Sequence, residues 1–209
     1  MKVTLIHALA SSVPPIIDSF ARLWPAAALR SILDDGLAGE LSRAGSLDER
    51  MMERFLALGQ YAAIDGPDAI LFTCSAFGPC IDAVRADVAP IHVRKPNEAM
   101  ITQAERLGRR VAVVAWFEPT LQSMPKEFPA AMDVIPVFVA GAQAAHNAGD
   151  FATHDALVAA AVAPLDVEVI ALAQFSIARA APVVRAHTDL PVLTTPDTAV
   201  LELKSALGC

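Results

Sequence analysis

The chain has 209 residues, of which 55% are hydrophobic and 19% charged, and its formal net charge is −7. This composition excludes a disordered chain, and the length is enough for one large or two small domains. The acidic balance, with no basic stripe, excludes a nucleic-acid-binding surface, and every apolar run is shorter than the roughly 20 residues that a membrane-spanning helix needs. The three cysteines have neither metal-ligand nor disulfide-framework spacing, and the first residues form a strand rather than a signal peptide, so we expect reduced thiols and a cytoplasmic protein.

Strands and helices alternate along the first part of the chain. Buried strands are expected at 3–6, 28–33, 69–72 and 90–93. An apolar helical stripe follows the first strand. Ser46, with Glu49 three residues later, predicts a capping box at the start of another helix.

The same alternation continues in the second part of the chain, with strands expected at 111–117, 134–139, 167–172 and 191–193. A helix between the second and third of these strands carries His154 and Asp155, which look like a dyad in the sequence. Because neighbouring residues on a helix point in different directions, we expect both on the helix surface. A C-terminal helix begins near residue 195.

Alternating strands and helices indicate an α/β protein with doubly wound parallel sheets. The stretch around Cys74 and the stretch around Gln174 repeat one pattern, a buried strand followed by small or polar residues and a helix, at an offset of 100 residues. We therefore expect two pseudo-symmetric α/β domains facing each other across a cleft. The first comprises residues 1–97 with 195–209, and the second comprises residues 98–194.

Cys74 lies where a buried strand ends and a helix begins, which is where open α/β sheets place their chemistry. Backbone N–H groups and a positive helix end at such a junction favour a thiolate. The alternative is a packed thiol that behaves as a small hydrophobe. Of the other cysteines, Cys80 lies within the expected helix and Cys209 is the last residue.

Around these residues the chain resembles the aspartate/glutamate racemase superfamily over essentially its whole length. The resemblance depends on the Cys74-Ser75 junction, on residues 115–120 and on the Leu172-Ala173-Gln174 junction. The stretches 95–100 and 172–176 look like a racemase-like subgroup. The resemblance implies two pseudo-symmetric α/β domains with the active site between them, and no pyridoxal phosphate or metal. It also implies one cysteine from each half, one taking the α-proton of the substrate and the other returning a proton to the opposite face.

The chain departs from this pattern because the position of the second cysteine is Gln174, which cannot act as an acid or base near neutral pH. The resemblance implies that Cys74 is the acid/base or nucleophile, with His7 as the group opposite it. His7 also has a plainer explanation as a hydrogen-bonded strand-end histidine. The resemblance and the strand ends together indicate the following substrate-binding residues: Ser75, Ala76, Asn97, Trp116, Thr120, Gln174, Phe175 and Ser176. Several of these would otherwise simply cap helices or pack in the core.

We therefore expect a cofactor-independent, racemase- or isomerase-like enzyme that uses Cys74 to transfer a proton at the carbon α to a carboxylate. Its substrate would be a small amino acid or dicarboxylate, and the resemblance adds a homodimer as a family-level expectation. The alternatives are a cofactor-free decarboxylase, a maleate-type cis–trans isomerase, or a non-catalytic protein that binds a small carboxylate. No metal-ligand cluster and no phosphate-binding glycine loop is present in the sequence, and no nucleic-acid or membrane partner is expected.

Overall fold

A computed structural model describes residues 1–209, the whole chain, and divides it into two compact units. Unit 1 is Met1–Pro96 with Ala199–Cys209, and unit 2 is Asn97–Thr198. The sequence had suggested boundaries after residues 97 and 194. The C-terminal helix α10 (Thr195–Ala206) therefore begins in unit 2 and ends in unit 1. No helix of the chain is both long and apolar enough to cross a membrane.

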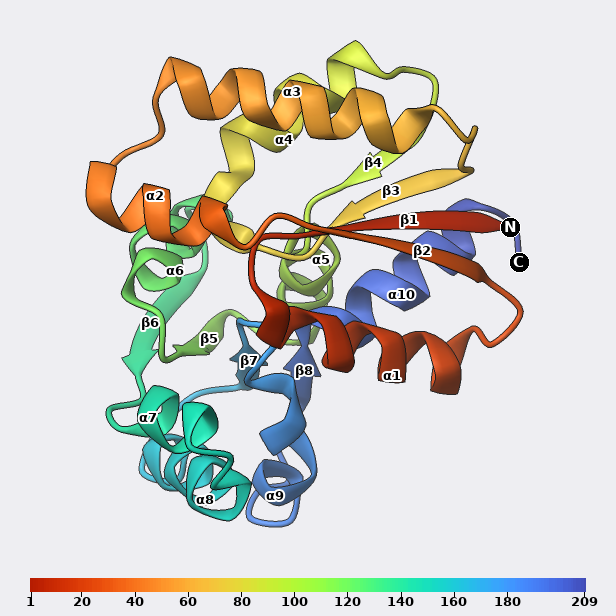
Figure 1. The fold of residues 1–209 in the computed structure, drawn as a ribbon. Coiled ribbons are helices and arrows are strands. Elements are labelled where there is room, and N and C mark those ends of the chain that lie inside the picture. The colour runs from red at the N-terminus through yellow and green to blue at the C-terminus, as the bar shows by residue number, and fades with distance from the viewer. The chain divides into compact units, whose positions relative to one another are not determined.

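Unit 1 is a four-stranded parallel sheet in the order β2-β1-β3-β4, with helices on both faces (Figure 1). Figure 1 shows α3 and α4 on one face of this sheet and α1 on the other. Its elements before α10 are β1 (Lys2–His7), η1 (Ala10–Ser12), α1 (Val13–Leu23), β2 (Ala28–Leu33), α2 (Gly36–Ala44), α3 (Glu49–Ala63), β3 (Ala69–Phe72), η2 (Ser75–Phe77), α4 (Gly78–Asp87) and β4 (His92–Arg94).

Unit 2 repeats this plan, with a parallel sheet in the order β6-β5-β7-β8. Figure 1 shows α7, α8 and α9 on one face of that sheet and α5 on the other. Its elements before α10 are α5 (Glu98–Leu107), β5 (Arg110–Ala115), α6 (Glu118–Ser123), η3 (Met124–Glu127), β6 (Asp133–Phe138), α7 (Ala142–Asn147), α8 (Phe151–Val162), β7 (Val169–Leu172), η4 (Ala178–Ala180), α9 (Ala181–Arg185) and β8 (Val192–Thr194).

The central strands are buried on both faces, which explains their unbroken apolar sequences. In β5, Val111 and Val113 pack against α5, whereas Ala112 and Val114 pack against α8 and α9 on the other face. The predicted α/β fold with two doubly wound parallel sheets is confirmed. One local prediction is wrong: α3 is capped by Asp48, whose carboxylate accepts the Met51 N–H, rather than by Ser46. The sequence also gave no prediction for α2.

The two sheets have the same pattern of backbone hydrogen bonds, and equivalent residues of β3 and β7 are 100 positions apart in the sequence. Thr73 N–H donates to Ile6 C=O in unit 1, and Ala173 N–H donates to Val114 C=O in unit 2. At the other end of the same strands, Asp68 and Glu168 are likewise equivalent, and each accepts a backbone N–H from the start of the neighbouring strand. This register makes Cys74 and Gln174 equivalent positions.

Candidate functional site

The carboxyl end of the unit 1 sheet carries a connected set of polar side chains around His7, of which Ser12 and Thr73 are buried and Ser31 is exposed. The ring Nδ1 of His7 lies 2.8 Å from Thr73 Oγ1 and 3.3 Å from Ser12 Oγ. Its Nε2 lies 3.3 Å from Ser31 Oγ on β2. Both ring nitrogens are thus hydrogen bonded within the unit. Burial lowers the pKa of His7 to about 4, so the imidazole is neutral at neutral pH.

One set of donors satisfies this network. Ser12 Oγ donates to Leu9 C=O at 2.7 Å, which leaves Ser12 as an acceptor for the Thr73 hydroxyl at 2.9 Å. Thr73 in turn accepts from the Nδ1–H of His7, whose Nε2 then accepts from Ser31. In this assignment each of the three hydroxyls donates one hydrogen bond, so the His7 ring is held at both nitrogens.

Cys74 follows Thr73 directly and is half-buried, with an extended backbone that leads into the short helix η2. Burial raises the pKa of the Cys74 thiol to about 11, and the hydrogen bond from the Ala76 N–H only partly opposes that rise. The expectation that the strand–helix junction favours a thiolate is therefore wrong for this structure. The three-residue helix supplies one backbone donor, and loss of water around the sulfur outweighs it.

At the equivalent position of unit 2, Gln174 is held by its side-chain carbonyl. Gln174 Oε1 accepts the backbone N–H groups of Trp116 at 2.7 Å and of Phe117 at 3.0 Å, directly after β5. This geometry fixes which way round the amide lies, and it leaves Nε2 as the part of Gln174 without a partner in the chain. Gln174 therefore presents a hydrogen-bond donor, in contrast to the thiol of Cys74.

The other expected site residues follow the ends of four strands: Ser75 and Ala76 follow β3, Asn97 follows β4, Trp116 and Thr120 follow β5, and Phe175 and Ser176 follow β7. Ser75 and Ala76 form the start of η2 in unit 1. In unit 2, Asn97 is buried and donates to Glu127 Oε2 at 2.6 Å, and Thr120 is buried in the first turn of α6. The remaining expected residues, Trp116, Phe175 and Ser176, are also buried in unit 2.

The prediction that His154 and Asp155 lie on the helix surface is wrong. His154 is fully buried, and its Nδ1 lies 2.7 Å from Asp155 Oδ1. Arg179 of η4 pairs with the same carboxylate through Nε at 3.0 Å and Nη2 at 3.2 Å. His146 of α7 contacts His154 edge to face. Although adjacent residues on a helix point in different directions, the His154 ring and the Asp155 carboxylate still reach each other.

Sequence reasoning did not identify Ser12 and Thr73 as members of the polar network in unit 1. The signal available was the pairing of polar residues at two strand ends, His7 and Thr73, which parallel register brings side by side.

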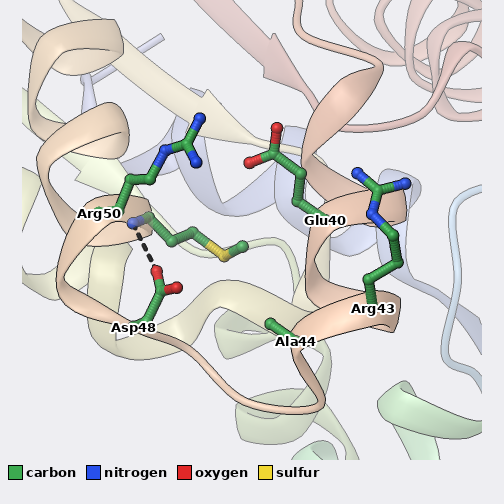
Figure 2. Close-up of a pocket in the computed structure, with 6 residues that line it drawn as sticks. Glu40, Arg43, Ala44, Asp48 and Arg50 are labelled. Carbon is green, nitrogen blue, oxygen red and sulfur yellow. Dashed lines mark hydrogen bonds between the residues drawn. The ribbon is translucent and has the colours of Figure 1, made fainter.

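A second feature of unit 1 is a surface pocket of about 510 Å³ between the end of α2 and the start of α3 (Figure 2). Glu40, Arg43 and Arg50 line its exposed walls, and none of the expected site residues belongs to it.

No group of three or more His, Cys, Asp or Glu side chains is placed to hold a metal ion. No protein-family model matches the sequence, and no curated protein matches it either.

Solved structures with a similar fold include glutamate racemase from Francisella tularensis, with a TM-score of 0.73 at 12% identity over 99% of this chain and 80% of that one. The aspartate racemase of Picrophilus torridus has a TM-score of 0.72 at 12% identity, over 99% of this chain and 94% of that one. Arylmalonate decarboxylase has a TM-score of 0.70 at 17% identity, over 100% of this chain and 93% of that one. At such identities the likeness concerns the fold.

Proposed function

Starting from a chain with the fold of the aspartate/glutamate racemase superfamily, we propose a cofactor-independent enzyme that protonates a carbon next to a carboxylate. The observation that carries this proposal is the position of the Cys74 thiol, half-buried at the junction between β3 and η2. Burial raises the pKa of this thiol further above neutral pH, so it is protonated there. A protonated thiol is a proton donor. Cys74 is thus the proposed general acid, and a small carboxylate is the proposed substrate.

The protonation state of Cys74 favours decarboxylation over racemisation. With a pKa of about 11, only about one Cys74 thiol in ten thousand is ionised at pH 7, so proton abstraction by the thiolate starts from a rare form. Two-sided racemisation also needs a second acid or base. Gln174 cannot supply one, and both ring nitrogens of His7 are already hydrogen bonded.

Decarboxylation of a disubstituted malonate-type acid needs only one proton donor. The C–C bond to the departing carboxyl group breaks, CO₂ leaves, and the electron pair stays on the α-carbon as an enediolate. The Cys74 S–H then gives its proton to that carbon, and the thiolate regains a proton from water. This reaction is our first candidate within the class. Racemase or isomerase activity is the second, supported by the fold shared with glutamate and aspartate racemases.

We assign the substrate-binding residues by which of their groups can donate a hydrogen bond to a substrate oxygen. We propose that Gln174 Nε2 donates to a substrate oxygen, because Gln174 Oε1 is already occupied by two backbone N–H groups. The hydroxyl and amide groups of Ser75, Asn97, Thr120 and Ser176 are further proposed carboxylate ligands. The remaining proposed substrate-binding residues are the backbone at Ala76 and the side chains of Trp116 and Phe175. That these residues act together with Cys74 on one substrate stays a prediction from the resemblance, as do the homodimer and the cytoplasmic location.

The test is turnover in heavy water with a panel of amino acids, dicarboxylates and disubstituted malonates. Decarboxylation consumes the substrate and leaves one deuterium on the product α-carbon, whereas racemisation labels the recovered substrate. We expect Cys74→Ala to lose at least about 100-fold in kcat, since positioned acids typically contribute that much. Cys209→Ser removes the exposed terminal thiol and serves as the control. Full activity in Cys74→Ala would refute the assignment, and tight binding without turnover or exchange would favour a binding protein.

Gln174→Glu tests the donor assignment independently. The carboxylate retains an acceptor for the Trp116 and Phe117 N–H groups but offers a second acceptor where the amide had a donor. We expect KM for an anionic substrate to rise about 10-fold or more, because one hydrogen bond to a charged group is lost and like charges then face each other. An unchanged KM would show that Gln174 does not contact the substrate carboxylate.

A further inference from the structure

We propose that His146 is a positioning residue for Gln174, acting through Trp116, and that a proton on the His146 ring releases Gln174 from its anchor. The importance of this release for turnover rests on the proposed function, in which Gln174 Nε2 donates to a substrate oxygen. The effect on the Gln174 anchor itself needs no substrate. His146 is not among the residues proposed to contact the substrate, and it lies in the short helix α7 that follows β6.

Two contacts connect His146 to Gln174. The ring centroids of His146 and Trp116 are 6.0 Å apart, and the planes of the two rings are tilted by 38°. The backbone N–H of Trp116 donates to Gln174 Oε1 at 2.7 Å, and the N–H of Phe117 donates to the same oxygen at 3.0 Å. Trp116 therefore holds Gln174 through its backbone and packs on His146 through its side chain.

Packing, rather than hydrogen bonding, holds the Trp116 side chain. Its indole Nε1 is buried and has no hydrogen-bond partner in the chain. The ring packs in the apolar cluster that includes Val158 and Ile177, and the His146 ring contacts it. Because no hydrogen bond fixes the indole, a change in packing at His146 is transmitted to Trp116 and to the backbone N–H that it carries.

Neutral rings surround the His146 side chain, which is half-buried. Besides Trp116, it contacts Phe151 and His154 edge to face, at 5.7 and 5.6 Å between ring centroids. The guanidinium carbon of Arg179 lies 4.0 Å from the centroid of the Phe151 ring, so a positive charge already lies beside this cluster. Three ring contacts also remove water that would solvate a charge on His146.

The carboxylates near this cluster are already engaged. Asp155 of α8 lies 2.7 Å from His154 Nδ1 and accepts two hydrogen bonds from Arg179 of η4. The exposed carboxylate of Asp150 caps the start of α8. A proton on His146 therefore adds a second positive charge next to Arg179, and the carboxylate of the cluster is already paired.

Protonation of His146 opposes the packed arrangement of this cluster. Burial, followed by the charges of His154 and Arg179, lowers the pKa of His146, and the side chains of Asn147 and Asp155 only partly oppose that change. The neutral ring thus stabilises the packed arrangement fully above the ordinary value of 6.5, and this stabilisation is lost as the pH falls through the lowered pKa. By reciprocity, loosening the cluster makes His146 easier to protonate.

The experiment measures amide hydrogen exchange by NMR, corrected for the intrinsic effect of pH, while the ring resonances of His146 report its protonation in the same samples. We expect the protection factors of the Trp116 and Phe117 amides to fall about 10-fold as His146 takes up its proton, which corresponds to a coupling of one pKa unit. The Ala173 amide, which donates to Val114 C=O within the sheet, is the internal reference and should not change.

His146→Phe keeps a ring at this position but cannot take up a proton, so the two amides should stay protected at low pH. His187→Phe is the matched control, because His187 is exposed and its Nδ1 lies 2.8 Å from Val183 C=O, outside the cluster. If His146→Phe does not fold, Gln174→Ala tests the same coupling from the other side. It should raise the midpoint of the His146 titration by about one pH unit.

A loss of protection that follows the His146 titration, persists in His187→Phe and disappears in His146→Phe supports the proposal. Unchanged protection while His146 titrates overturns it, as does a loss that persists in His146→Phe or an unshifted His146 midpoint in Gln174→Ala. With an identified substrate, KM should rise on the acid side of the titration in the parent but not in His146→Phe, at equal kcat. Should Gln174→Glu leave KM unchanged, the proposed substrate contact fails, whereas the anchor of Gln174 is read from exchange alone.

Discussion

Acid should weaken this protein in a manner that can be traced to His7. Burial lowers the pKa of His7 to about 4 from an ordinary value of 6.5. A histidine in the unfolded chain takes up its proton near pH 6.5, whereas the folded protein resists protonation until about pH 4. Between these values the unfolded state binds more protons, so the free energy of unfolding decreases as the pH falls. The stabilisation is complete above pH 6.5 and is lost on the way to pH 4. The 2.5-unit difference amounts to about 3 kcal/mol.

The measurement is urea unfolding, followed by far-UV circular dichroism, at about pH 7.5 and about pH 4.5. His7→Gln is the variant to compare, because glutamine does not titrate and can still hydrogen bond with hydroxyl partners. We expect the variant to be the less stable protein at pH 7.5, with the gap closing by ~2–3 kcal/mol at pH 4.5. The pKa of His146 is also lowered by burial, but His146 is present in both proteins and cancels in the difference. Parallel losses of stability in the two proteins would refute the reasoning.

Two further predictions concern packing and a partly buried ion pair. Gly59→Ala should destabilise the fold by about 1–3 kcal/mol, because a Cβ there would lie 2.3 Å from Val84 Cγ1, and thermal unfolding measures this. Gly39→Ala is the control, because a Cβ at residue 39 would lie 3.6 Å from its nearest neighbour, Arg43 Nη1. The higher helix propensity of alanine should therefore stabilise α2 by roughly 0.5–1 kcal/mol. Equal effects in both variants would contradict the packing argument. Arg179→Met should cost on the order of 2 kcal/mol in urea unfolding by leaving the Asp155 carboxylate without its bidentate partner. No loss in that variant would show that His154 alone suffices for Asp155.

Most of the fold is predictable from the sequence because doubly wound sheets bury their central strands on both faces. Such strands appear as short apolar runs between helices, as in 69–72 and 169–172. Helix α2 was missed since glycines at 36 and 39 lower its helix propensity, and its packing in the fold overrides that preference. The capping prediction failed at Ser46 because Asp48 is an equally good cap two residues later.

The strand-end positions of Cys74 and His7 were predictable from the sequence, whereas the direction of the Cys74 pKa shift was not. Cys74 and His7 stand out because polar residues follow apolar strands, and parallel topology places strand ends along one edge. Ser12 and Thr73 were missed because they are 61 residues apart, and only the register joins them. The direction of the Cys74 pKa shift depends on how much water reaches the sulfur. No residue pattern encodes that amount of water, so the sequence left a thiolate favoured by backbone donors and a packed thiol as alternatives.

The division of the chain into one continuous and one interrupted unit has a consequence for its synthesis. Every residue of unit 2 is added to the growing chain before the last segment of unit 1, Ala199–Cys209, is made. That segment completes unit 1 through Glu202, which binds Arg94, and Lys204, whose Nζ donates to Leu23 C=O. The half that carries the thiol is therefore the last to acquire all of its contacts, although its first strand is the first to be translated. Until Ala199–Cys209 has been made, the thiol-bearing unit has all four strands of its sheet but lacks these contacts from α10.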